Sequence, residues 1–169
     1  AGALSYAANL DAMVFFLTTI FPLIKQRRPG VKLYITGSTQ GVDLSRLPID
    51  DSVIFTGFLH DIRPRVAKSM VSIVPLRLGG GTRLKILEAM ALRVPVVSTP
   101  KGCEGLHLVP GQDLLVADDP TQFAEAVLCL FDERDFREQM AFNGCAKVRE
   151  MYDWNRIGEK FSKMIHSMV

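Results

Sequence analysis

Residues 71–98 read VSIVPLRLGGGTRLKILEAMALRVPVVS, and this stretch decides the fold. Residues 71–75 and 95–98 are short runs rich in β-branched side chains, which are typical of buried strands. Residues 82–92 lie between them and have the apolar spacing of a helix. A strand, a helix and a second strand in this order predict two parallel strands joined by a crossover helix.

The same alternation of strand and helix continues on both sides of this stretch. Three further strands are expected at residues 31–36, 53–56 and 114–116. Helices are expected at residues 9–28, 61–68 and 120–131, and residues 133–169 are expected to form two helices that meet near residues 152–154. This alternation predicts an α/β fold, a Rossmann-like parallel sheet flanked by helices on both faces.

Length and composition describe an ordinary single domain, residues 1–169. The net charge of +2 is small and the basic residues are scattered, which argues against a nucleic-acid partner. Cys103, Cys129 and Cys145 lie far apart, so neither a disulfide framework nor a zinc site is expected. Free cysteines favour a reducing, cytoplasmic compartment. The chain opens on an alanine rather than a methionine, so we expect a piece of a longer protein.

The apolar segment 12–24, AMVFFLTTIFPLI, resembles neither a membrane span nor a leader. A bilayer needs roughly 20 residues, which is more than this segment has. Asp11 precedes the segment and basic residues follow it, the reverse of the charge order in a secretory signal. We interpret it as a buried helix interrupted at Pro22.

The loop after Val74 is the first candidate for a binding site, because ligands of such folds bind at the carboxyl ends of the strands. The three glycines at residues 79–81 let the backbone approach a ligand closely. The free amides and the dipole at the start of the next helix favour an anion such as a diphosphate. Thr82 is placed to cap that helix or to donate its hydroxyl to a phosphate, and Arg83 adds positive charge.

Glu88 follows one turn further along the expected helix and shares a face with Leu84 and Lys85. Its carboxylate is placed to accept hydrogen bonds from two adjacent sugar hydroxyls, as on a ribose. An alternative is that the glycines form only a flexible turn and that Glu88 pairs with Lys85 on a solvated face. The stretch lacks both GxxxxGK[ST] and GxGxxG, which disfavours a P-loop and a nicotinamide site.

Residues 81–106, GTRLKILEAMALRVPVVSTPKGCEGL, resemble the donor-binding motif of the family 4 glycosyltransferases, which have the two-domain GT-B fold. Three other segments are also similar to that family: residues 2–38, VIFTGFLHDIRP at 53–64, and residues 119–154. The resemblance therefore covers essentially the whole chain. It implies that residues 1–169 are the carboxyl-terminal half of a GT-B enzyme, whose amino-terminal half binds the acceptor.

The resemblance also implies roles for individual residues. Glu88 matches the second glutamate of the family's paired-glutamate motif, which holds the donor ribose, and the backbone of Phe58 and Leu59 matches nucleobase contacts. Gly81 and Thr82 match the loop that faces the diphosphate and the sugar. The whole expected set of donor-binding residues is Phe58, Leu59, Gly79, Gly80, Gly81, Thr82, Arg83, Leu84, Lys85 and Glu88. The catalytic residues stay unknown.

The chain departs from the family pattern at three places. The family's first glutamate, which touches the donor sugar, falls at Gly80. The glycine after the helix is Arg93, whose backbone costs on the order of 1 kcal/mol if it turns left-handed there. The family's basic pair near the start of the domain is replaced by Ser5, Tyr6 and Asn9. Lys101 is a candidate for supplying the missing charge.

The loop after residues 95–98 is expected to lie beside the glycine loop. Glu104 in that loop has two readings: it approaches the donor, or it only caps the next turn. Cys103 is interpreted as a passive small residue, because no histidine lies near it in the sequence.

The resemblance implies a retaining hexosyltransferase that uses a nucleotide-diphosphate sugar, with no metal or other cofactor. Its role would be in polysaccharide or other glycan synthesis, with an unknown acceptor, and peripheral membrane association of the full-length protein stays open. The 169-residue chain alone is expected to be inactive. The alternative function is a non-catalytic nucleotide-binding module of the same fold, which the glycine at position 80 favours.

Overall fold

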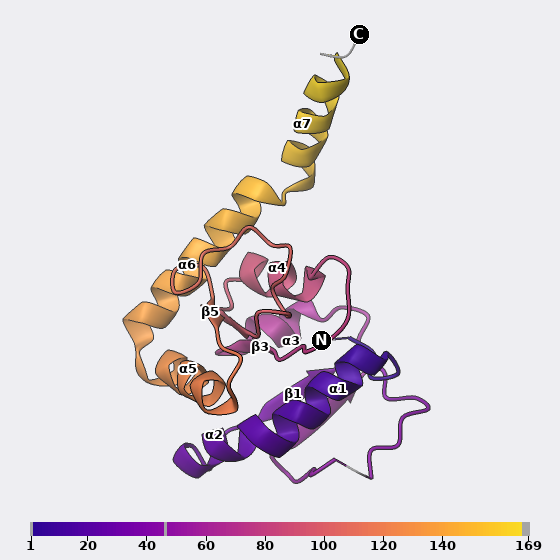
Figure 1. Cartoon of the computed structure of the whole chain (residues 1–169), viewed down its shortest axis with the longest axis vertical. Coiled ribbons are helices and arrows are strands. Elements are labelled where there is room, and N and C mark those ends of the chain that lie inside the picture. The colour runs from indigo at the N-terminus through magenta and orange to yellow at the C-terminus, as the bar shows by residue number, and fades with distance from the viewer. Residues whose placement is uncertain (1, 46, 167–169) are drawn as a thin grey trace.

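A computed structural model describes residues 2–45 and 47–166 (Figure 1). The elements are α1 (Ala7–Phe15), the π-helical turn η1 (Phe16–Ile20), α2 (Phe21–Arg27), β1 (Leu33–Thr36), β2 (Val53–Gly57), α3 (Arg63–Ala67), β3 (Ser72–Val74), α4 (Leu84–Ala91), β4 (Val96–Ser98), β5 (Leu115–Val116), α5 (Pro120–Asp132), α6 (Arg134–Met151) and α7 (Trp154–His166). All five expected strands form, and the order of strands and helices is the one that the sequence predicts. The α/β expectation is therefore confirmed.

The strands form two parallel sheets rather than the single sheet expected. β1 pairs with β2, and β3, β4 and β5 form the other sheet in that order. β1 and β3 are not hydrogen-bonded to each other, and a cavity of about 740 Å³ lies between them, lined by side chains such as Ile35 and Ile73. Thr36 and Val74, at the ends of β1 and β3, line one smaller cavity, so the carboxyl ends of the two sheets meet.

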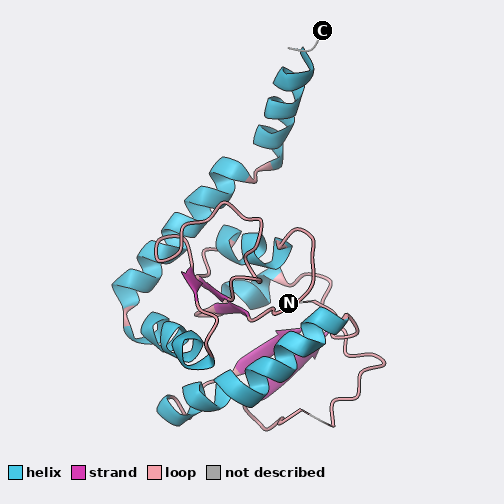
Figure 2. Ribbon diagram, viewed as in Figure 1, coloured by secondary structure: helices cyan, strands magenta, loops and turns pink. Residues whose placement is uncertain are grey.

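Helices cover both faces of the strands, as expected (Figure 2). Neighbouring residues of a strand point to opposite faces, and β4 shows where each face packs. Val97 belongs to a core cluster with Phe16 and Phe123, from η1 and α5. Val96 belongs to a second cluster with Ile86 and Val148, from α4 and α6.

The first helical segment is continuous from α1 to α2 and is not broken at Pro22. A π-helical turn, η1, precedes the proline instead. Proline has no N–H to donate to the carbonyl four residues earlier, and the wider turn absorbs that missing bond. The hydroxyls of Thr18 and Thr19 donate to the carbonyls of Val14 and Phe15. The resulting helix, Ala7–Arg27, has 21 residues, so by length and composition it meets the criteria for a membrane span. Its η1 face is buried in the core.

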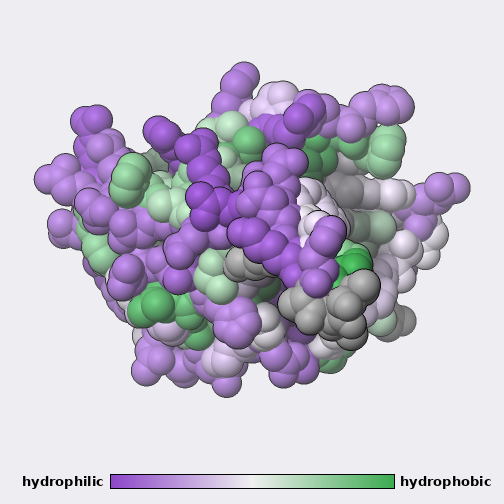
Figure 3. Space-filling model, turned by 90° about the horizontal axis from the view of Figure 1, so that it is seen from above, coloured by the Kyte–Doolittle hydropathy of each residue, from purple (hydrophilic) through white to green (hydrophobic). Residues whose placement is uncertain are grey.

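The chain ends in two helices that meet where the sequence predicts. α6 ends at Met151 and α7 begins at Trp154, and α7 extends away from the body of the molecule (Figure 1). The expected helix boundary at residue 169 lies outside the described residues. Seen from above, the surface is mostly hydrophilic, and its hydrophobic side chains form small separate groups (Figure 3).

Candidate functional site

The glycine loop, residues 79–81, connects the end of β3 to the start of α4. Gly79 and Gly81 have φ angles of 100° and 83°, in the left-handed region that favours glycine. Gly80 has no positive φ, and a Cβ added there would meet no atom within 4 Å. The backbone therefore requires glycine at the two outer positions. At Gly80, the missing side chain leaves open space.

The amides of this loop are available to a ligand. Within the described residues, no carbonyl or side chain accepts a hydrogen bond from the backbone N–H groups of residues 79–83. Gly80, Gly81 and Thr82 are exposed. Unpaired, exposed amides at the start of a helix attract anions because they combine donors with the positive end of the helix dipole.

Arg83 does not lie where the sequence suggested. α4 begins at Leu84, so Arg83 rather than Thr82 is the N-cap residue, and no side chain caps the helix. The Arg83 side chain is buried, with 5% of its surface exposed. Its Nη1 donates to the Gly80 carbonyl at 3.0 Å and its Nη2 to the Gly79 carbonyl at 3.1 Å. The buried guanidinium therefore stabilises the loop through hydrogen bonds to two of its carbonyls.

Lys85 links the glycine-loop helix to the start of the chain. Its Nζ donates to Asn9 Oδ1 at 2.8 Å. Burial lowers the pKa of Lys85; the charge on Arg83 lowers that pKa further, and Glu88 raises it. Asn9 lies where the family pattern has its basic pair. Because Lys85 donates to Asn9, its ammonium group places a positive charge at this position. Lys101, the candidate for that charge, is paired elsewhere.

Glu88 is exposed on α4, and its carboxylate makes no hydrogen bond or ion pair within the described residues. The alternative reading, a surface pair between Glu88 and Lys85, is not formed because Lys85 turns to Asn9. Glu88 and Lys85 line one end of the large cavity, and Leu84 is 59% exposed on the first turn of α4. The rest of that cavity is lined mainly by apolar side chains, and its other charged lining residues are Arg27, Arg28, Lys32, Arg65 and Lys68.

Phe58 and Leu59 follow the carboxyl end of β2. Phe58 is 73% exposed and packs edge-on against His60, with ring centroids 5.4 Å apart. The helix after this loop, α3, contacts α4. The contact of Phe58 and Leu59 with a nucleobase stays a prediction.

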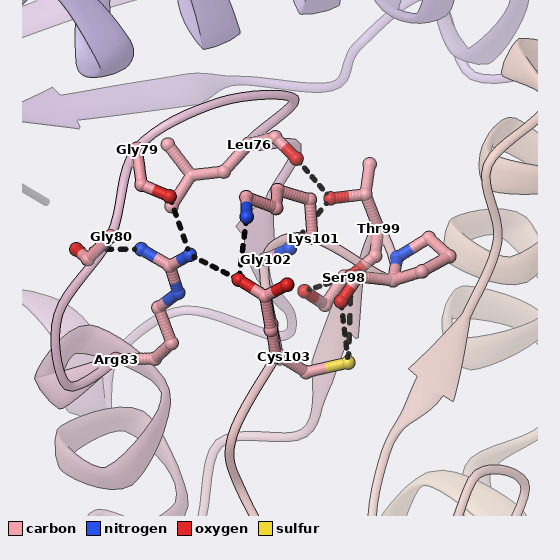
Figure 4. A network of polar contacts seen from close by, with 11 residues as sticks. Leu76, Gly79, Gly80, Arg83, Ser98, Thr99, Lys101, Gly102 and Cys103 are labelled. Carbon is pink, nitrogen blue, oxygen red and sulfur yellow. Dashed lines mark hydrogen bonds and ion pairs between the residues drawn. The ribbon is translucent and has the colours of Figure 1, made fainter.

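The loop after β4 packs directly against the loop after β3, as expected (Figure 4). The buried Thr99 hydroxyl donates to the Leu76 carbonyl and accepts from the Gly102 amide. A Cβ at Gly102 would lie 2.3 Å from Ser98 Oγ and 2.5 Å from the Val74 carbonyl, so only glycine fits. The two loops form one packed unit.

Glu104 approaches the glycine loop from this second loop. Its Oε2 lies 2.6 Å from Lys101 Nζ and 3.6 Å from Arg83 Nη2. The hydrogen bond and charge of Lys101 lower the pKa of Glu104. Burial raises the pKa of the neighbouring Cys103 thiol, which agrees with a passive role because the thiolate is the nucleophile. The sequence missed the contact between Arg83 and Glu104, since no spacing rule joins two loops.

The described residues contain no group of three or more His, Cys, Asp or Glu side chains placed to hold a metal ion.

Two comparisons of sequence bear on this site. A model of the family described as "Glycosyl transferases group 1" matches residues 1–133. The chain is 25% identical over 164 residues to an uncharacterized 44.6 kDa protein in the cps region of Klebsiella pneumoniae, covering 92% of the chain and 42% of that protein. It is 29% identical over 163 residues to a GDP-mannose-dependent monoacylated alpha-(1-6)-phosphatidylinositol monomannoside mannosyltransferase of Corynebacterium glutamicum, covering 89% and 43%. The chain thus spans less than half the length of these relatives.

Solved structures show the same fold. Anabaena Alr3699/HepE in complex with UDP superposes with a TM-score of 0.80 at 18% identity, over 98% of this chain and 48% of that one. The C-terminal domain of a glycosyl transferase group 1 family protein (LpcC) from Francisella tularensis superposes with a TM-score of 0.72 at 19% identity, over 91% and 84%. The fold is therefore that of a GT-B carboxyl-terminal domain.

Proposed function

The chain belongs to the group 1 glycosyl transferases, and from this membership we propose that residues 1–169 form the domain that binds the nucleotide-sugar donor. The observation that carries this proposal is the row of unpaired amides at residues 79–83, with the unpartnered carboxylate of Glu88 one turn further along α4. The amides hold the diphosphate, Glu88 accepts hydrogen bonds from the ribose hydroxyls, and the backbone of Phe58 and Leu59 contacts the base.

The reaction is sugar transfer with retention at the anomeric carbon. The bond from the anomeric carbon to the diphosphate breaks, an acceptor oxygen forms the new bond, and the donor phosphate takes the acceptor proton. Charge builds up on the leaving diphosphate, and preorganised amides stabilise such charge. No metal is required in this scheme. The acceptor binds to an amino-terminal half outside this chain, as the relatives' greater length supports.

The biological setting is proposed from the relatives. The Klebsiella protein lies in the cps region and the Corynebacterium enzyme is named for mannosyl transfer to a phosphatidylinositol mannoside. We therefore propose a cytoplasmic hexosyltransferase of glycan or polysaccharide synthesis. A lipid-linked acceptor would bring the full-length protein to the membrane surface.

Calorimetric titration of the 169-residue chain with UDP, GDP, UDP-glucose and GDP-mannose tests donor binding. Glu88→Gln is expected to lower the affinity for whichever of these ligands binds by about tenfold, since it removes a charged acceptor worth about 1.5 kcal/mol. Glu138→Gln is the matched control, because Glu138 is exposed on α6 and pairs with Arg134. Equal affinities for Glu88→Gln and Glu138→Gln would remove Glu88 from the site.

A measurement of sugar transfer distinguishes a glycosyltransferase from the alternative, a non-catalytic nucleotide-binding module. The full-length protein is expected to transfer sugar, and the 169-residue chain is expected to bind donor without transferring it. Donor binding by the full-length protein with no transfer to any acceptor in a glycan panel would favour the non-catalytic module. Turnover by the chain alone would contradict an acceptor site on the other half.

A further inference from the structure

Two loops that are 21 residues apart in sequence are joined at the candidate site by one buried arginine. Arg83 donates to the carbonyls of Gly79 and Gly80, and the same Nη2 that bonds Gly79 lies 3.6 Å from Glu104 Oε2 (Figure 4). Its remaining nitrogen, Nε, is buried and has no partner within the described residues. The guanidinium therefore holds a fixed place between the glycine loop and the loop that carries Glu104.

Glu104 is held by one oxygen only. Both of its cationic neighbours, Lys101 and Arg83, approach Oε2. Oε1 makes no hydrogen bond within the described residues, and the side chain is 57% exposed. A carboxylate fixed in this way keeps an acceptor free for a hydroxyl donor.

Gly80 and this carboxylate are linked through Arg83. The Gly80 carbonyl and Glu104 contact the same guanidinium group. No atom would obstruct a Cβ at Gly80 within 4 Å, and its backbone does not require glycine. The position of the missing side chain is therefore open to a ligand, and the guanidinium that contacts the Gly80 carbonyl also contacts Glu104.

We propose that Arg83 is a positioning residue that fixes the glycine loop and Glu104 together, and that Glu104 Oε1 accepts a hydrogen bond from a hydroxyl of the donor's sugar over Gly80. This inference rests on the proposed function and adds the side chain that contacts the sugar of the donor. The diphosphate is bound by the amides, and the sugar beyond it meets the Glu104 carboxylate. Glu104 therefore affects a nucleotide sugar and not its nucleoside diphosphate.

The test compares two ligands on three variants of the 169-residue chain. The ligands are whichever of UDP-glucose and GDP-mannose binds, and the corresponding nucleoside diphosphate. Glu104→Gln is expected to lower the affinity for the nucleotide sugar by about fivefold to tenfold, because a charged hydrogen bond to the sugar is weakened. The affinity for the nucleoside diphosphate is expected to stay within about twofold of the wild-type value. Glu150→Gln, an exposed position on α6, is expected to change neither affinity.

Arg83→Lys tests the positioning role. Lysine keeps the charge but lacks the planar guanidinium that contacts both carbonyls and Glu104. The affinity for both ligands is therefore expected to fall. Amide exchange of residues 79–83 is expected to change as the loop loosens. If Arg83→Lys does not fold, Glu104→Gln alone decides the proposal, since its exposed side chain is not part of the core.

Each outcome has one meaning. Equal weakening of both ligands by Glu104→Gln would make Glu104 only a support for the loop and overturn the sugar contact. No change for either ligand would overturn it too. Failure of the wild-type chain to bind any nucleoside diphosphate would instead overturn the proposed function, which is a different result from the loss of sugar selectivity.

Discussion

Lys85 Nζ donates a 2.8 Å hydrogen bond to Asn9 Oδ1, which ties the helix that carries Glu88 to the first helix of the chain. Asn9 is fixed in turn, because its Nδ2 donates to the Ala3 carbonyl at 2.9 Å. The two residues lie 76 positions apart in the sequence. The contact therefore adds to the core packing that holds α4, which carries Glu88.

Asn9→Leu is expected to lower the free energy of unfolding by about 1–2 kcal/mol, because it removes the acceptor from a half-buried ammonium group. Urea unfolding measures this change. Asn9→Asp is the matched comparison, since it lacks the Nδ2 donor to Ala3 as Asn9→Leu does but keeps an acceptor for Lys85, so the difference between the two variants reports the Lys85 contact. Asn9→Leu as stable as wild type would show that the contact contributes nothing.

Lys85 also predicts a dependence of stability on pH. Burial holds its pKa in the folded state below the ordinary value of 10.5. Between that lowered pKa and 10.5, the unfolded chain binds more protons than the folded chain, so the stability that Lys85 contributes rises with pH. The measurement is urea unfolding of wild type and Lys85→Met from about pH 8 upward. The wild type is expected to gain relative to the variant as pH rises, and a constant difference would contradict the burial of the ammonium.

Arg93 ends α4 in the left-handed conformation that the sequence raised as one alternative, with φ of 57°. The amides of Arg93 and Val94 donate to the carbonyls of Met90 and Ala89, which is a Schellman motif. Arg93→Gly is expected to raise the free energy of unfolding by about 0.5–1 kcal/mol, because it removes the Cβ that crowds this backbone. Arg93→Ala, which keeps the Cβ, is expected to give no gain in the same urea experiment. A gain for Arg93→Ala as large as for Arg93→Gly would assign the effect to the lost charge.

The order of elements was predictable because each strand is a short apolar run, and most of these runs are bounded by glycine or proline. β3 and β4 form within one residue of their expected bounds. The division into two sheets was not predictable, since the spacing of β1 and β3 across the cavity between them is a tertiary feature that no local pattern specifies. The π-helical turn before Pro22 is likewise a tertiary outcome, because a proline in a helix permits a break, a kink or a wider turn.

The candidate site divides in the same way. Positions fixed by the backbone, such as the glycine loop before α4, follow from the sequence because a strand followed by glycines and a helix leaves free amides. The positions of long side chains do not follow from the sequence. Arg83 and Lys85 were both expected among the donor-binding residues, but the Arg83 side chain donates to carbonyls of the glycine loop and the Lys85 side chain donates to Asn9. Their rotamers are set by partners far away in the chain, and no spacing rule contains that information.

Gly102 provides the sharpest test of how the two loops of the site pack. A Cβ there would clash with Ser98 Oγ and with the Val74 carbonyl, and a backbone carbonyl has little room to move. Gly102→Ala is expected to lower the free energy of unfolding by about 1–3 kcal/mol, the usual cost of overpacking. It is also expected to weaken nucleotide binding, because the glycine loop, which supplies the amides, packs against the displaced loop. Gly30→Ala is the control, since a Cβ at Gly30 meets nothing within 4 Å. Urea unfolding and titration with the nucleoside diphosphate measure the two effects. A Gly102→Ala chain with the stability and affinity of Gly30→Ala would mean that the loops are free to separate, and Arg83 would then have no fixed Glu104 to position.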